Sequence, residues 1–257
     1  MLNKKDVDSF YQNIMITHKL FKMTFEKNKL LEKQHCKNDP RLKIESQKKE
    51  KVNELINQIS EPSEKFIISN IKDSGLKIIA INLFADMKKY DFTYPSSVPK
   101  NRETVLQDQA TRYDLLSKIK LDKHTIYCTL AAIEVCERND IPQSISDLVI
   151  ILAILHDFGK HPEVFEKYKN KNDDLHNVVS SYYVKKTFRK YIGKIIHEDT
   201  YKQLIHTLYN HHKLPYKLQN NNKNDKNERD TLLIYLLNKA DYLAREKEQI
   251  FLEGQET

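Results

Sequence analysis

The sequence predicts an all-α protein, and three observations support this fold class. Of the 257 residues only 4 are Gly and 7 are Pro, so residues that interrupt helices are rare. Lys, Leu, Ile and Glu are abundant, and all but Ile have high helix propensity. Apolar side chains recur at helical spacing along most of the chain. Mean hydropathy is −0.68 and no apolar run reaches membrane-spanning length, so we expect no membrane association.

The first 102 residues are expected to form a basic helical N-terminal region, followed by a core domain over residues 103–257. Apolar and charged residues alternate at helical spacing over residues 5–34, and a second, polar helix is predicted up to residue 59. Residues 76–87 are a further, apolar-rich helix candidate. Two prolines in residues 90–102 predict an extended connection before the core.

The positive charge is concentrated near the N-terminus. The net charge is +7, and residues 1–60 hold 13 Lys and Arg against 8 Asp and Glu. Such an excess is one signature of a surface that binds nucleic acid. Because the two signs are mixed, a solvated helical face in a Lys-rich protein is the other interpretation, and the charge pattern alone favours it.

The stretch Leu148–Lys160, LVIILAILHDFGK, is the centre of the predicted core. Eight apolar residues run directly into His156 and Asp157. Ser144 and Asp147 precede the run with capping-box-like spacing, and Gly159 follows as a helix stop. We therefore expect a short, fully buried helix that carries an imidazole and a carboxylate to the floor of a cavity. Burying both without a partner is costly, and a metal ion satisfies both at once.

Other histidines and an aspartate lie on further predicted helices. One histidine, His124, opens a helix whose residues 124, 128, 131 and 135 share a face, and alone it is more often a core residue than a ligand. A polar loop over residues 165–174 leads to His176, and a second, low-complexity loop is predicted over residues 218–230. The complete ordered set is His124, His156, Asp157, Lys160, His176, His211, His212 and Asp241.

This ordered set resembles the HD superfamily of metal-dependent phosphohydrolases over about residues 120–250. The segments HDFGKHPEVFEKY, YNHHKLP and NKADYLARE look most like the HD nuclease portion of the CRISPR-associated Cas3 type. Two departures are Lys213 in place of glycine after the paired histidines, and a first histidine far from the N-terminus. The long leader also resembles HD proteins of plasmid transfer, the relaxase-type modules. No Walker-type loop is present, so no helicase is expected.

The resemblance implies a site for two divalent metal ions. By resemblance, His124, His156, Asp157 and Asp241 hold one ion, and Asp157 bridges to a second. By resemblance, His176, His211 and His212 hold that second ion. Nitrogen and carboxylate ligands without thiolate suit Mn, Fe, Co, Ni or Mg better than structural zinc. Paired ions of this kind activate a water for in-line attack on phosphorus.

Three further side chains lie near this set in the sequence. Lys160 is expected either to contact a phosphate oxygen, as a catalytic residue beside Asp157, or to act as a cation at a helix C-terminus. His206 is assigned to packing or surface. Arg245 lies four residues after Asp241, and an exposed ion pair between the two is expected.

The implied reaction is hydrolysis of a phosphodiester bond, with single-stranded nucleic acid as the expected substrate and partner. A nucleotide or cyclic-dinucleotide phosphohydrolase, a module of a plasmid-transfer or DNA-processing protein, and an inert HD scaffold remain alternatives, because fold similarity does not choose among them. Three cysteines and the absence of an apolar signal region lead us to expect a cytoplasmic location. The sequence leaves protein partners and oligomeric state open.

Overall fold

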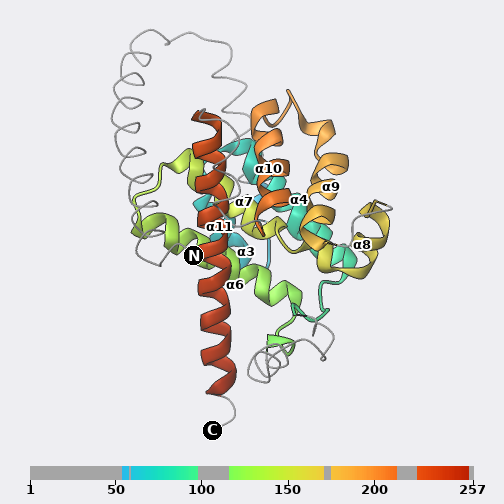
Figure 1. Cartoon of the computed structure of the whole chain (residues 1–257), viewed down its shortest axis with the longest axis vertical. Helices are drawn as coiled ribbons and strands as arrows, with labels where there is room; N and C mark the ends of the chain where they lie inside the picture. The colour runs from blue at the N-terminus through green and yellow to red at the C-terminus, as the bar shows by residue number, and fades with distance from the viewer. Residues whose placement is uncertain (1–53, 58, 98–115, 171–174, 213–224, 255–257) are drawn as a thin grey trace, which may run out of the picture. The chain divides into compact units, whose positions relative to one another are not determined.

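The computed structural model describes residues 54–57, 59–97, 116–170, 175–212 and 225–254 (Figure 1). These residues form helices joined by short connections, and none of them belongs to a strand beyond two isolated bridges, Pro95 with Lys120 and Ile192 with Ile196. The helices are α3 Pro62–Asn70, α4 Ser74–Tyr90, α6 Leu121–Arg138, α7 Gln143–Leu155, η2 Phe158–Lys160, α8 Pro162–Tyr168, α9 His176–Thr187, η3 Arg189–Tyr191, α10 Glu198–Asn210 and α11 Asp225–Glu253. The predicted all-α class is confirmed.

The helices that the structure describes lie in one compact unit, Leu55–Thr257. That unit includes α3 and α4, which pack with α6 and α7. The domain boundary expected between residues 102 and 103 falls outside the described residues, as do the helices expected before residue 54 and the larger part of the basic N-terminal region. Among the described helices, none has both the length and the apolar character needed to cross a bilayer.

Helix α7 is the centre of this unit, as the sequence predicts. Every side chain of Leu148–Leu155 is buried, and the helix contacts α4, α6, α10 and α11. A helix that is apolar on every face is stable in water only when other helices cover all of its faces. The last turn of α7 therefore ends inside the protein, where His156 and Asp157 follow.

The start of α7 differs from the prediction. The helix begins at Gln143 after Pro142, and no side chain caps it, so the expected capping box is wrong. Asp147 is buried and instead accepts backbone hydrogen bonds from Lys72 and Asp73, at 2.8–3.1 Å. The carboxylate thus satisfies amide groups just before α4, 74 and 75 residues away in the chain.

The end of α7 is a close backbone crossing. The α-helix stops at Leu155, and Gly159 lies in the short 3-10 turn η2 that follows. A Cβ atom at Gly159 would lie 2.1 Å from the backbone oxygen of His176, so no larger residue fits there without a shift. The glycine is therefore needed for close packing of η2 on the first turn of α9, more than as the predicted helix stop.

Two further predictions about loops need correction. Part of the expected polar loop over residues 165–174 is helical, because α8 continues to Tyr168. Part of the loop expected over residues 218–230 is helical as well, because α11 already begins at Asp225. Polar composition alone does not distinguish such helical segments from loops. Helix α11 then runs beside α6 and α7, and α9 packs on α10 (Figure 1).

Candidate metal centre

All seven predicted metal ligands meet around the inner end of α7. His156 and Asp157 follow its last turn, and His124 comes from the first turn of α6. His176 is the first residue of α9, and His211 and His212 directly follow α10. The seventh ligand, Asp241, comes from the middle of α11. Residues that are 117 positions apart in the sequence, from 124 to 241, therefore reach one place in the fold.

The first group consists of His124, His156 and Asp241. One nitrogen or oxygen atom from each lies within 4.8 Å of the others, so the three are spaced to share an ion. The Nε2 atom of His124 is 3.2 Å from Oδ1 of Asp241, and that of His156 is 3.9 Å from the same oxygen. Both histidines are buried, whereas the Asp241 side chain is 36% exposed, so the group opens to solvent on the α11 side.

The second group consists of His176, His211 and His212. Their nitrogens also lie within 4.8 Å of one another. The Nε2 atoms of His176 and His212 are 2.9 Å apart. Two ligands each bound at about 2.0–2.1 Å to one ion have a similar separation when the angle between them is near 90°. His211 is buried and His212 is exposed, so this group also reaches the surface.

Asp157 lies between the two groups. Its Oδ2 atom is 3.4 Å from the Nε2 atoms of both His124 and His156. Its Oδ1 atom is 3.3 Å from Nε2 of His176. One carboxylate oxygen therefore faces each group, which is the arrangement that a carboxylate shared by two ions requires.

The free ring nitrogens show that these residues fit metal ions. The buried Nε2 atoms of His124, His156 and His211 and the Oδ1 atom of Asp241 have no hydrogen-bond partner among the described residues. The Nδ1 atoms of His156 and His211 face backbone oxygens, of Ala153 at 2.8 Å and of Leu208 at 2.7 Å. An acceptor at Nδ1 keeps the proton there and leaves the Nε2 lone pair available as a ligand.

The third Nδ1 atom has a charged partner that sequence reasoning missed. Nδ1 of His124 is 2.8 Å from Oε1 of Glu248, a fully buried carboxylate two turns beyond Asp241 on α11. A carboxylate behind a ligand histidine fixes the ring orientation and increases its basicity. The spacing of seven residues from Asp241 was the available signal, but Glu248 lies in the highly charged run AREKEQ, where charged residues are usually exposed.

Neighbouring charges shift the pKa values of the site residues in different directions. Burial alone lowers the pKa of His124, but Asp157, Asp241 and the carboxylate at Nδ1 outweigh burial and raise it to about 10. Burial likewise opposes ionisation of Asp157, but the charges of His156 and Lys160 hold its pKa well below the usual value. In the second group, burial and the neighbouring His176 lower the pKa of His212 to about 4.

Two cations lie beside Asp157, and one residue outside the predicted set holds both. The Lys160 ammonium donates to Oδ2 of Asp157 at 2.7 Å and to the backbone oxygen of Ser96 at 3.0 Å. The Arg245 guanidinium donates to the Ser96 hydroxyl at 2.8 Å and to its backbone oxygen at 3.1 Å. Ser96 is fully buried, so this contact fixes both cations at the edge of the site.

The expected ion pair of Arg245 with Asp241 is present, but it is not an exposed one. Its side chain is only 13% exposed, lies 3.8 Å from Asp241 and 3.9 Å from Asp157, and forms its close ion pair with Glu248 at 3.0 Å. A guanidinium can serve several acceptors in fixed directions, which explains why it occupies this crowded position.

Three other described histidines, His161, His197 and His206, stay outside both groups. His206 is about half exposed and lies 3.2 Å from Asp230, in agreement with a surface role. His161 is buried and stacks on Phe92 with ring centroids 5.0 Å apart, so its role here is packing.

A comparison with known protein families gives one match that includes the metal-ligand candidates. Residues 121–246 match the family described as HD domain. This part of the chain is therefore similar to HD domains. The HD superfamily consists of metal-dependent phosphohydrolases, so the domain indicates a hydrolase that uses divalent metal. All seven ligand candidates and Lys160 lie inside the matched residues, whereas Ser96 and Glu248 lie outside them. Searches of curated proteins and of solved structures found no match.

Proposed function

We propose that this protein hydrolyses phosphodiester bonds in single-stranded nucleic acid with the help of two divalent metal ions. The observation that carries the proposal is the pair of ligand groups joined through Asp157, with two cations fixed beside it. The resemblance to HD nucleases of the Cas3 type supports the nuclease assignment.

The ligand groups and the cations have separate roles in this proposal. When bound, the two ions lower the pKa of a water and neutralise charge on the phosphorus oxygens. His124, His156 and Asp241 would hold one ion, the second group would hold the other, and Asp157 would contact both. Lys160 donates to Asp157 and Ser96, which leaves one of the three ammonium protons for a phosphate oxygen.

The exposure of the site favours a polymer over a small molecule. His212 is exposed, and the side chains of Asp241 and His176 are 36% and 27% exposed. Nucleotide sites usually enclose most of the ligand surface, whereas a strand only has to pass over the reacting atoms. A site with both groups open at the surface therefore suits a strand, and a nucleotide or cyclic dinucleotide remains the alternative that the experiment has to exclude.

The test is a substrate panel on metal-loaded protein. Purified protein is incubated with Mn, Ni or Mg and with labelled single-stranded DNA, single-stranded RNA, duplex DNA, nucleotides and cyclic dinucleotides. We expect metal-dependent cleavage of at least one single-stranded polymer, and inhibition by a chelator. Hydrolysis of nucleotides alone, with every polymer intact, would replace the nuclease with the nucleotide phosphohydrolase.

The first predicted variant is Asp157→Ala. Because Asp157 faces both ligand groups, its loss should lower the bound metal and reduce hydrolysis to background, while helix content stays unchanged. Metal content by mass spectrometry, hydrolysis of bis(p-nitrophenyl) phosphate and circular dichroism provide the three measurements. Asp230→Ala, which removes a carboxylate paired with His206 away from the ligands, is the matched control. Full turnover by the Asp157 variant would disprove the mechanism.

A further inference from the structure

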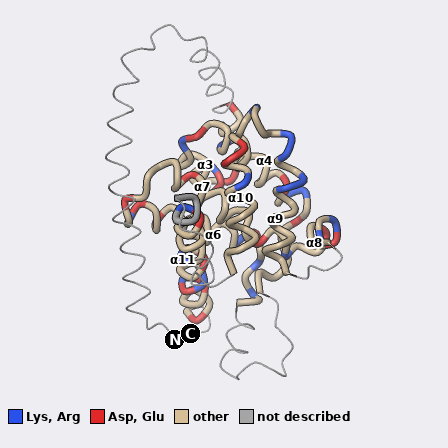
Figure 2. Tube along the Cα trace, turned by 45° about the horizontal axis from the view of Figure 1, so that its top comes forward, with Lys and Arg blue, Asp and Glu red and all other residues tan. Residues whose placement is uncertain are grey.

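A strongly basic stretch lies at the end of α9, away from the metal ligands. Residues 185–194, KKTFRKYIGK, contain five Lys and Arg and no Asp or Glu. Lys185, Lys186, Arg189 and Lys190 are all exposed, and we call these four residues the α9–η3 basic surface. In Figure 2 blue segments recur between the labels of α4 and α9.

Among the described residues, these four cations have no carboxylate partner of the kind that several other cations have. Lys186 and Lys190 instead lie over the rings of Tyr168 and Tyr191, 5.9 and 4.9 Å from the ring centroids. Lys88 pairs with Glu64, Lys169 with Glu166, and Lys202 with Glu198, each at 2.7–2.8 Å. In the described part of the chain, no carboxylate forms an ion pair with any residue of the α9–η3 basic surface. Four like charges within six residues repel one another, so this surface costs free energy in the isolated protein.

Stabilisation of α9 explains the positions of only two of these four cations. Lys185 and Lys186 lie in the last turn of α9, where cations interact favourably with the helix dipole. Arg189 and Lys190 lie in η3, a three-residue turn that has no comparable dipole. Their position beside the other two cations therefore indicates an anionic partner.

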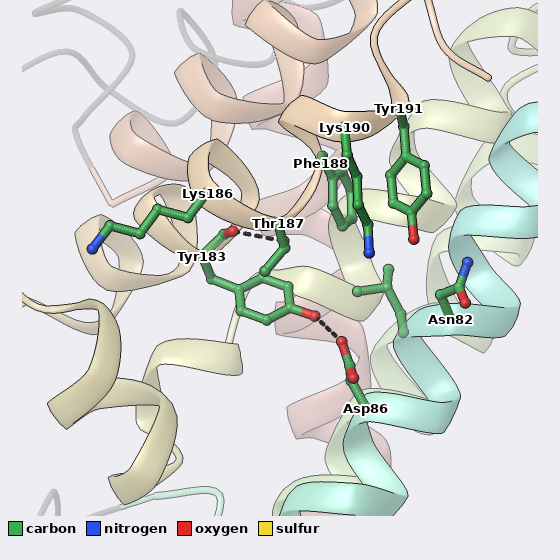
Figure 3. Close-up of a pocket in the computed structure, with 9 residues that line it drawn as sticks. Asn82, Asp86, Tyr183, Lys186, Thr187, Phe188, Lys190 and Tyr191 are labelled. Atoms are coloured by element: carbon green, nitrogen blue, oxygen red, sulfur yellow. Dashed lines mark hydrogen bonds between the residues drawn. The ribbon is translucent and has the colours of Figure 1, made fainter. Parts of the chain in front are cut away.

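A cavity next to the basic surface contains groups that recognise a base. It has a volume of about 200 Å³ and lies between α4 and the end of α9 (Figure 3). Lys190 and Tyr191 extend into it towards Asn82 and Asp86. The Asn82 amide nitrogen donates to Ile78 and one Asp86 oxygen accepts from the Tyr183 hydroxyl, which leaves an acceptor oxygen on each of the two side chains.

The size and chemistry of this cavity fit one nucleobase. Its volume is below the range of roughly 300–1,000 Å³ that is usual for drug-sized ligands. The Lys190 ammonium lies 4.9 Å from the centroid of the Tyr191 ring, so a base can stack on this ring once Lys190 turns to a phosphate. The free oxygens of Asn82 and Asp86 can accept from an exocyclic amino group. Only an unstacked base can enter such a cavity, so the site would select single strands over duplex.

We propose that the α9–η3 basic surface and this cavity form a second binding site for single-stranded nucleic acid. The cations contact successive phosphates, and one unpaired base enters the cavity. This inference rests on the proposed function. It extends that function because a second site would let the protein bind a polymeric substrate in preference to a single nucleotide. Helix α9 carries His176 at one end and Lys186 ten residues later, about 15 Å apart at 1.5 Å per residue. One nucleotide cannot contact both, whereas a strand can.

The experiment compares two triple variants of the full chain. Lys186→Gln/Arg189→Gln/Lys190→Gln removes three cations of the proposed surface. Lys65→Gln/Lys123→Gln/Arg138→Gln removes three exposed cations from other surfaces and gives the same net charge. Binding of a labelled single-stranded oligonucleotide is measured by fluorescence anisotropy in chelator, so that no cleavage occurs, over a series of salt concentrations.

We expect the first triple variant to bind at least tenfold more weakly, and the control to bind as the unmodified protein does. The slope of log affinity against log salt should become less steep by about 2, because each lost contact to a single strand removes about 0.7. Equal affinity of the two triple variants would overturn the inference.

The cavity is tested separately through Tyr191. Tyr191→Leu should weaken binding to the single strand about tenfold with little effect on duplex, and Tyr191→Phe should restore binding because the ring remains. If Tyr191→Leu lowers the affinity for single strand and duplex equally, no base enters the cavity and this part of the proposal is wrong.

Hydrolysis of bis(p-nitrophenyl) phosphate distinguishes the two proposals. This small substrate does not reach the basic surface, so the first triple variant should hydrolyse it at the normal rate. Normal hydrolysis with unchanged polymer binding refutes the second site alone. Weakened polymer binding, together with a metal-loaded protein that cleaves no polymer, refutes the proposed function and leaves the second site in place.

Discussion

Only the Nδ1 atom of His124 has a hydrogen-bond partner among the described residues, and the sequence does not reveal that partner. Its Nε2 atom faces Asp157 and Asp241, whereas Nδ1 contacts the buried Glu248. Residue types and their order predicted the atoms that would contact metal. The carboxylate behind the ring was missed because its environment depends on how α11 packs on α6.

Glu248→Gln should therefore weaken metal binding without removing a ligand. The amide can still accept a hydrogen bond from Nδ1 but carries no charge, so we expect about 10–100-fold lower metal affinity. Calorimetric titration with Mn measures this change. Glu246→Gln, on the exposed side of the same helix, should bind as the unmodified protein does. Identical affinities for the two variants would show that the Glu248 charge is unimportant.

Metal binding to the first group should depend on pH. The pKa of His124 is raised to about 10 in the metal-free protein, so the ring is protonated at pH 7 and must lose a proton before Nε2 can bind metal. Lowering the pH therefore lowers the affinity, by up to about tenfold per pH unit. Titrations in two buffers with different ionisation enthalpies should reveal the released proton.

The second group should behave differently. Burial and neighbouring histidines lower the pKa of both His211 and His212, to about 4 for His212, so both are already neutral at pH 7. The metal affinity of the second group should therefore depend less on pH between 6 and 8 than that of the first group, because these two of its three histidines need not lose a proton. A parallel decrease in both groups would contradict this assignment.

At the scale of the elements, the helices and the histidines that meet at the site were predictable, whereas individual polar contacts between distant segments were not. The apolar run predicts α7, and the order of histidines predicts which helices face the site. The partners of Asp147 come from residues 72 and 73, so a local pattern suggested a helix cap that does not exist. Ser96 was missed for the same reason, since it meets Lys160 and Arg245 only in the folded chain.

The crossing of η2 and α9 gives a prediction at this scale. Gly159→Ala places a methyl group 2.1 Å from the backbone oxygen of His176, so the start of α9 has to move. We expect a loss of about 1–3 kcal/mol in unfolding free energy, as for other overpacked sites, together with weaker metal binding by the second group. Urea denaturation and metal titration measure the two effects.

Gly254→Ala is the control for this substitution. The nearest atom to a Cβ at Gly254 is 3.4 Å away, and the residue is exposed at the end of α11. Its stability should therefore change little. If both alanine variants unfold at the same urea concentration, the close crossing has no energetic importance.

At the scale of the whole molecule, the site connects most of the described helices. Ligand candidates come from α6, the end of α7, α9, the end of α10 and α11, and Ser96 adds the segment after α4. In the metal-free protein, buried nitrogens without partners oppose this convergence. The role of the seven ligands remains a prediction, but their proximity links metal binding to global stability.

Divalent metal should therefore raise the melting temperature. A ligand at 100 times its Kd stabilises the folded state by about 2.7 kcal/mol, which is roughly 5–10 °C for a chain of this size. Differential scanning fluorimetry with Mn and with chelator measures the shift. Asp157→Ala should lose most of it. A melting temperature that metal leaves unchanged would mean that the two groups do not bind ions in the folded protein.

The position of Asp241 and Glu248 in α11 also determines when the site can assemble during translation. His176, His211 and His212 precede α11 in the chain, so all three histidines of the second group are synthesised before Asp241. The first group has to wait for Asp241, and His124 lacks its buried carboxylate until Glu248 has emerged. A nascent polypeptide therefore lacks a complete pair of ligand groups until the residues of α11 have been synthesised.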